Sequence, residues 1–190
     1  MGQISFKIIL VVPFFVLLCL SLFILYGYDI EIVDGKLNIK SNISTQMKSN
    51  LIGQKKPNFY LTSLKDYEIP QEKHLDIADF KLINFWARWC APCRAEHNTL
   101  MGIQENGYHI IGINYKDVSS KAEEFLTELG NPYIAIGSDK SGKTAIDWGV
   151  YGIPETFLLD KDNKILLRIA GPLTRAIYES ELRKYLEPKN

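Results

Sequence analysis

The chain has 190 residues, 46% of them hydrophobic, which suits one domain of ordinary size together with a shorter accessory segment. Acidic and basic side chains balance, 22 against 22, so the formal net charge is +0 at pH 7. No block of lysine and arginine interleaves with aromatic residues, which argues against a nucleic-acid-binding protein, because such a protein needs a concentrated basic surface.

A long apolar run lies near the N-terminus. The 20 positions from Ile8 to Gly27 contain no charged side chain, and as a helix they would extend about 30 Å, the thickness of a bilayer's hydrocarbon core. A cleaved signal peptide is the alternative, but its apolar core is usually about 7–15 residues and ends at a small-x-small site, which Leu25–Tyr28 does not offer. A lipid-modified Cys19 is disfavoured by the bulky Leu18 before it. We expect residues 1–28 to form an uncleaved, single-pass membrane anchor.

The charges beside this run predict its orientation. Lys7 precedes it, whereas Asp29, Glu31 and Asp34 follow it. By the positive-inside rule the N-terminus is cytoplasmic and the rest of the chain is exported. Residues 29–50, a mixture of serine, asparagine, threonine and lysine with little periodic hydrophobicity, are expected to form a tether that connects the anchor to a domain at residues 51–190.

From residue 51 onward, short apolar runs alternate with amphipathic stretches. For one of these helices, Ser119 or Ser120 is the expected N-cap and Gly130 the stop. Strands that alternate with helices and end in a hairpin and a helix predict a mixed sheet covered on both faces. The predicted strands are 81–86, 109–115, 133–136, 156–159 and 164–169, and the predicted helices are 91–105, 119–129, 143–150 and 174–186.

A C-x-x-C motif, formed by Cys90 and Cys93, lies between the first of these strands and the first helix. Residues three apart on a helix lie on the same side, so a disulfide can close there without rearranging the backbone. Cys90 would stand at the helix N-terminus, where unpaired N–H groups and the helix dipole favour a thiolate and lower the pKa of a thiol. Cys93 would be shielded one turn later. The pattern predicts a redox-active pair in which Cys90 attacks and Cys93 resolves.

A cysteine pair at this spacing can also bind zinc, attach haem or serve structure alone. A zinc site would need a second C-x-x-C or paired histidines, and only His97 is near. Haem attachment needs a histidine directly after the second cysteine, where Arg94 stands. Two buried structural cysteines stay an open alternative.

The motif and its surroundings resemble a known family. The segment WARWCAPCRAEH is similar to the active-site segment of thioredoxin-like reductases, and LIGQKKPNFYLTSL, GINYKD, ELGNPY and GVYGIPETFLLD resemble the CcmG/DsbE branch, the thioredoxins of cytochrome c biogenesis. This resemblance covers residues 51–186. It implies an α/β, thioredoxin-like fold with a mixed central sheet flanked by helices, a strand–helix insertion at about residues 118–140, and an N-terminal transmembrane helix.

The resemblance also implies site residues. Ile153 and Pro154 match a cis-proline turn opposite the cysteines, which would offer backbone groups to a substrate strand. Trp89 matches the motif's aromatic residue and would shape the exposed surface beside the attacking sulfur. Glu155 and Glu96 match two acidic positions of the branch, and the alternative for each is a solvated surface charge.

One position departs from ordinary thioredoxins. They carry a buried aspartate where Asn84 stands, and that aspartate helps to move the proton of the resolving cysteine. An amide cannot do so. We expect Glu96 or Glu155 to take over this role.

The implied protein is a thiol–disulfide oxidoreductase anchored in the inner membrane with its catalytic domain in the periplasm. Its substrate would be oxidised apocytochrome c or a partner of the haem-ligation machinery, its electrons would come from a membrane thiol-transfer protein, and no metal or organic cofactor is implied. Two alternatives stay open: an oxidase that forms disulfides, and a non-enzymatic module that binds apocytochrome. The sequence does not give the reduction potential on which the direction depends.

Overall fold

The computed structural model describes residues 16–18, 21, 28–33, 36–41 and 50–187. The chain divides into two compact units, residues 1–44 and 45–190. In the first unit residues 16–18 and 21 are helical. Within the described residues no helix is both long and apolar enough to cross a bilayer. Most of the predicted anchor at residues 1–28 lies outside the described residues, so the anchor stays a prediction.

A β-hairpin occupies part of the segment for which the sequence predicted only a tether. Strand β1 (Tyr28–Val33) pairs antiparallel with β2 (Lys36–Ser41), with Ile30 opposite Ile39. Two signals were available in the sequence. Apolar and polar residues alternate along both strands, and the dipeptide Asp34-Gly35, which favours two-residue hairpin turns, separates them.

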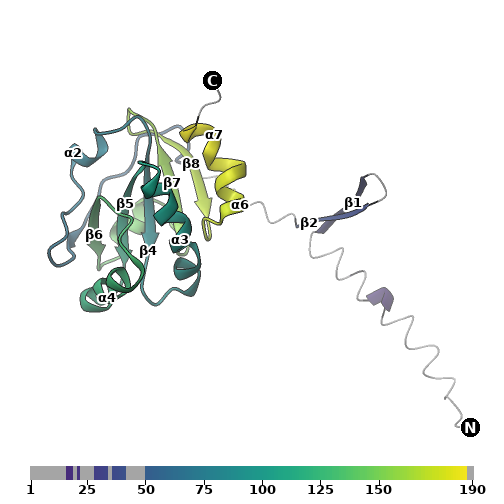
Figure 1. Ribbon diagram of the computed structural model, residues 1–190, viewed down its shortest axis with the longest axis horizontal. Coiled ribbons are helices and arrows are strands. Elements are labelled where there is room, and N and C mark those ends of the chain that lie inside the picture. Colours follow the sequence, from purple (N-terminus) through teal and green to yellow (C-terminus); the bar gives the residue numbers. More distant parts are fainter. Residues whose placement is uncertain (1–15, 19–20, 22–27, 34–35, 42–49, 188–190) are drawn as a thin grey trace, which may run out of the picture. The chain divides into compact units, whose positions relative to one another are not determined.

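The second unit is built on a six-stranded mixed sheet of order β3-β6-β5-β4-β7-β8 (Figure 1). The central strands β4, β5 and β6 run parallel, and the others are antiparallel to their neighbours. The thioredoxin-like α/β class is therefore confirmed. The strands are β3 (Thr62–Ser63), β4 (Lys81–Trp86), β5 (His109–Tyr115), β6 (Ala135–Asp139), β7 (Glu155–Leu159) and β8 (Ile165–Ala170).

Helices cover both faces of this sheet because alternate side chains of the central strands point to opposite sides. Leu82 and Trp86 of β4 belong to a core with α3, α4 and the C-terminal helix, and Figure 1 shows α3 lying across the sheet. Ile83 and Phe85 belong to a second core with α2 and α5. The helices are α2 (Glu72–Leu75), α3 (Ala91–Glu105), α4 (Ser119–Leu129), α5 (Lys143–Asp147), and a C-terminal stretch of α6 (Arg175–Ile177), the π-helical η1 (Tyr178–Leu182) and α7 (Arg183–Leu186).

The predicted insertion between β5 and α5 consists of α4 and β6, with two corrections. The predicted serine cap of α4 is wrong: Val118 precedes the first turn without a capping side chain, and Asp117 Oδ1 accepts the Val118 N–H at 2.8 Å. The predicted strand at 133–136 is shifted along the chain: β6 begins at Ala135 and continues to Asp139, and the N–H of Tyr133 before it is bonded to Asn131 Oδ1.

Two helices also differ from expectation. Helix α5 ends at Asp147 rather than at residue 150, because Gly149 has a left-handed φ of 63° and the chain turns away. The C-terminal helix begins at Arg175 with Thr174 as its N-cap, and a π-turn at 178–182 interrupts it, which apolar periodicity does not reveal. The remaining predicted strands and helices lie within one residue of their observed bounds.

Packing of the insertion against β5 leads to a first prediction. A Cβ on Gly112 would lie 2.8 Å from Cγ of Tyr133, whose ring is also stacked on Trp86. We expect Gly112→Ala to lower the free energy of unfolding by about 1–3 kcal/mol in urea denaturation, because the enclosed ring cannot move away. In Gly102→Ala the new Cβ meets nothing within 4 Å on α3, so this control should gain about 0.5–1 kcal/mol from helix propensity. Equal effects of the two substitutions would contradict this packing.

Candidate active site

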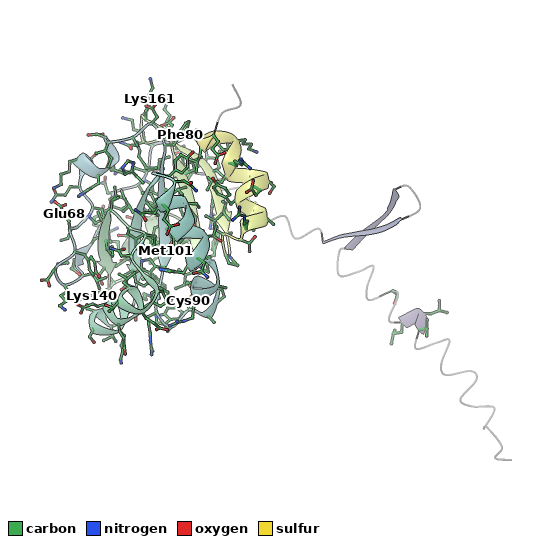
Figure 2. All side chains as sticks on the ribbon, in the orientation of Figure 1. Glu68, Phe80, Cys90, Met101, Lys140 and Lys161 are labelled. Carbon is green, nitrogen blue, oxygen red and sulfur yellow. A yellow bond between two sulfur atoms is a disulfide. The ribbon has the colours of Figure 1, made fainter. Side chains whose placement is uncertain are left out.

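The cysteine pair lies at the N-terminus of α3, directly after the central strand β4. Cys90 and Cys93 form a disulfide with their Cα atoms 5.3 Å apart. Cys90 is the N-cap of α3, and its Sγ accepts the Cys93 N–H at 3.1 Å. Pro92 lies in the first turn, where its missing N–H does no harm. Figure 2 places Cys90 at the opposite end of the domain from Phe80, which precedes β4.

Burial does not distinguish the two cysteines. Cys90 is 4% exposed and Cys93 is 2% exposed, whereas Trp89 beside them is 56% exposed. The expected difference in reactivity between the two thiols therefore comes from the helix. Cys90 faces the unpaired N–H groups of the first turn, whereas Cys93 lies within that turn.

The loop before β7 forms the other side of the site. The Ile153–Pro154 peptide bond is cis, as the resemblance implied. The carbonyl oxygen of Ile153 lies 3.5 Å from Cys90 Sγ. A sulfur in a disulfide carries no hydrogen, so this is a van der Waals contact in the oxidised protein, and only a reduced thiol could donate to that oxygen.

A buried carboxyl group lies one helical turn after Cys93. Glu96 is 1% exposed, so the alternative interpretation, in which it is a solvated surface charge, is wrong. Its Oε1 accepts from Asn84 Nδ2 at 2.9 Å and its Oε2 accepts from the Leu173 N–H at 2.6 Å. Burial raises the pKa of Glu96 from 4.5 to about 7, and these two donors partly oppose the rise. A carboxyl group with this pKa can gain or lose a proton near neutral pH.

The amide of Asn84 stands at the centre of a fully buried polar group. Its second amide hydrogen reaches Thr156 Oγ1 at 3.0 Å, and its Oδ1 accepts from the Tyr133 hydroxyl at 2.9 Å. Every polar atom of this side chain therefore has a partner. Asn84, which stands in place of the thioredoxin aspartate, is thus part of a connected hydrogen-bond network that includes Glu96.

Glu155 is also buried, at 2% exposure, so the interpretation of this residue as a solvated surface charge is wrong as well. Arg168 of β8 pairs with both of its oxygens, at 2.7 and 3.0 Å, and donates to the Gly149 carbonyl at 2.7 Å. Oε1 of Glu155 also accepts the N–H of Tyr151 and, at 3.4 Å, that of Gly152. Both carboxylate oxygens are therefore occupied by groups that fix the loop before Pro154.

The turn after β5 supports the segment before Cys90. Asp117 Oδ2 accepts the Arg88 N–H at 2.6 Å, and Trp89 Nε1 donates to the Lys116 carbonyl at 3.2 Å. Lys116 has a φ of 44°, which is uncommon for a residue with a side chain. This turn, predicted only as part of a family segment, orients the exposed Trp89. No group of three or more His, Cys, Asp or Glu among the described residues is placed to bind a metal ion.

Comparisons with known proteins find matches over most of the chain. Residues 52–186 match the Redoxin family. The chain is 39% identical to the thiol:disulfide interchange protein HelX of Rhodobacter capsulatus, over 90% of this chain and 94% of the relative. It is 40% identical to DsbE of Escherichia coli, over 79% of this chain and 82% of the relative. The chain belongs to the redoxin family, among the DsbE/HelX thiol:disulfide interchange proteins.

A solved structure supports the same assignment. The crystal structure of a DsbE-type thiol:disulfide interchange protein from Chlorobium tepidum superposes with a TM-score of 0.58 at 26% identity, over 71% of this chain and 95% of that one. The Cys90–Cys93 disulfide and these relatives together identify the redoxin domain as a thiol–disulfide oxidoreductase.

Two buried residues of this redoxin site were not predicted from the sequence. Arg168 stands in the apolar run ILLRIA of β8, and a charge inside such a run is a usable signal for a buried ion pair. Tyr133 lies 49 residues from Asn84, and no local pattern reveals that its hydroxyl would reach that amide.

The buried carboxyl group of Glu96 predicts how stability depends on pH. Its pKa is about 7 in the folded, oxidised protein and near 4.5 when unfolded, so the folded state binds more protons between these values. The contribution of Glu96 to stability must then fall as the pH rises through that window. We expect the unfolding free energy of the wild type, relative to Glu96→Gln, to fall by on the order of 3 kcal/mol between pH 4 and pH 8. A difference that is independent of pH would mean that Glu96 titrates as an ordinary surface group.

Proposed function

We propose that this protein is a membrane-anchored periplasmic oxidoreductase that reduces protein disulfides during cytochrome c biogenesis. The observation that carries the proposal is the position of Cys90 at the N-terminus of α3, in contact with the Ile153 carbonyl. The resemblance to the CcmG/DsbE branch favours apocytochrome c or a haem-ligation partner as the substrate. The charge-free run Ile8–Gly27 and the lysine before it favour a single-pass inner-membrane anchor.

Exposed apolar side chains on the motif and on the two segments that contact it favour a protein substrate. Trp89, Val118 and Tyr151 are 56%, 63% and 78% exposed. They come from three separate segments: the motif itself, the turn after β5 and the loop before Pro154. Large apolar side chains at a surface of this kind suit contact with an unfolded polypeptide.

The reaction is a two-step exchange of disulfides. The Cys90 thiolate attacks one sulfur of the substrate disulfide, the substrate S–S bond breaks, and the second substrate sulfur leaves as a thiolate that takes up a proton. Cys93 then loses its proton and attacks Cys90 Sγ, which releases the first substrate sulfur. The substrate gains two electrons and two protons, and Cys90–Cys93 becomes a disulfide that a membrane thiol-transfer protein reduces again.

Glu96 is the residue that we assign to the proton of Cys93. The two lie three residues apart on α3 and therefore on the same side of the helix. The pKa of Glu96, raised by burial to about 7, suits a group that accepts a proton near neutral pH. Glu155 remains the second candidate from the sequence, but its contacts with Arg168 and the loop N–H groups support a positioning role beside Pro154.

Cys93→Ser tests this function in cells. A serine hydroxyl cannot attack a disulfide at neutral pH, so the mixed disulfide through Cys90 should persist with exported partners of cytochrome c maturation. The adducts should run as larger bands on non-reducing gels, collapse with reductant, and stay with membranes after alkaline extraction.

The double variant Cys90→Ser, Cys93→Ser is the control and should form none of these adducts. Absence of adducts from Cys93→Ser would favour a non-enzymatic binding module. A strain without the protein should accumulate its trapped partners as disulfides; accumulation as free thiols would mean that the protein is an oxidase.

A further inference from the structure

The strand–helix insertion contributes one polar atom to the buried site. Tyr133, between α4 and β6, directs its hydroxyl to Oδ1 of Asn84 at 2.9 Å. Its ring stacks on Trp86 with centroids 5.5 Å apart, and it lies on Gly112, where a Cβ would collide with it. Burial raises the pKa of Tyr133 well above 10, so the hydroxyl keeps its proton throughout the physiological range.

By donating to Oδ1, that hydroxyl stabilises one orientation of the Asn84 amide. In the observed arrangement the carbonyl oxygen of Asn84 points to Tyr133, so both amide hydrogens are free to reach Glu96 and Thr156. If the amide rotated by 180°, its carbonyl oxygen would face the carboxyl group of Glu96. That orientation would suit a protonated carboxylic acid, which donates, and would repel an ionised carboxylate, which only accepts.

We propose that Tyr133 is a positioning residue for disulfide exchange: its hydroxyl fixes the Asn84 amide so that the NH₂ group faces Glu96 and favours the carboxylate that receives the proton of Cys93. The inference rests on the proposed role of Glu96 as that proton acceptor. It also assigns the insertion a part in the chemistry, because Tyr133 belongs to no element of the central strand–helix–strand unit β4–α3–β5.

The exchange of the reduced, full-length protein with dithiobis(nitrobenzoic acid) separates the two steps. Attack by Cys90 releases the first nitrothiobenzoate, and resolution by Cys93 releases the second. In Tyr133→Phe the ring and its packing remain, but Asn84 Oδ1 loses its donor. We expect the pH midpoint of the second phase to rise by about half to one pH unit, which slows that phase about 3- to 10-fold below the midpoint. The first phase should not change.

Three further variants make the test decisive. Tyr108→Phe removes a comparable tyrosine hydrogen bond, to the Leu186 carbonyl at 3.0 Å, and should leave both phases unchanged. In an Asn84→Ala background, Tyr133→Phe should add no further shift, because Tyr133 acts through that amide. Glu96→Gln should remove the second-phase inflection altogether.

The outcomes are distinguishable. If Glu96→Gln removes the inflection but Tyr133→Phe matches the wild type, the role of Tyr133 is refuted and that of Glu96 stands. If Tyr133→Phe slows both phases equally, or shifts the midpoint further in the Asn84→Ala background, Tyr133 acts through packing and the proposal fails. If Glu96→Gln leaves the second phase unchanged, the proposed proton acceptor itself is wrong. Circular dichroism establishes that each variant is folded.

Discussion

The desolvated carboxyl group of Glu96 is the constraint around which the inner part of the domain is arranged. Helix α3 carries it into the core one turn after Cys93, where burial raises its pKa to about 7. A carboxyl group in such a place needs hydrogen-bond partners in both protonation states. The sheet supplies Asn84 from its central strand, and the segment before the C-terminal helix supplies the Leu173 N–H.

Two sets of hydrogen bonds, from distant parts of the chain, hold the segments on either side of the disulfide. On one side Asp117 and the Lys116 carbonyl accept hydrogen bonds from the residues before Cys90, and the second of these bonds holds the exposed ring of Trp89. On the other, the buried pair of Glu155 and Arg168 fixes the loop that brings Ile153 into contact with Cys90. Burial of a charged pair carries a desolvation penalty. Such pairs are useful at a site where the relative placement of the reacting groups matters.

Local patterns predicted the parts of this fold that local physics determines. Strand β4 and helix α3 were predicted to the residue, because a buried apolar run and a Cys-Ala-Pro-Cys helix start define their bounds. Burial of the two glutamates could not be decided from the sequence, because it depends on which helix or strand covers them. The contacts of Tyr133 with Asn84 and of Arg168 with Glu155 link positions 49 and 13 residues apart, and no periodicity encodes them.

The most direct test of this account is the titration of the Glu96 carboxyl carbon by NMR in the oxidised protein. The account predicts a midpoint near pH 7, because burial disfavours the charged form. Assignment of that resonance by comparison with Glu96→Gln removes ambiguity with other glutamates. A midpoint near 4.5, the ordinary value for an exposed glutamate, would contradict the account.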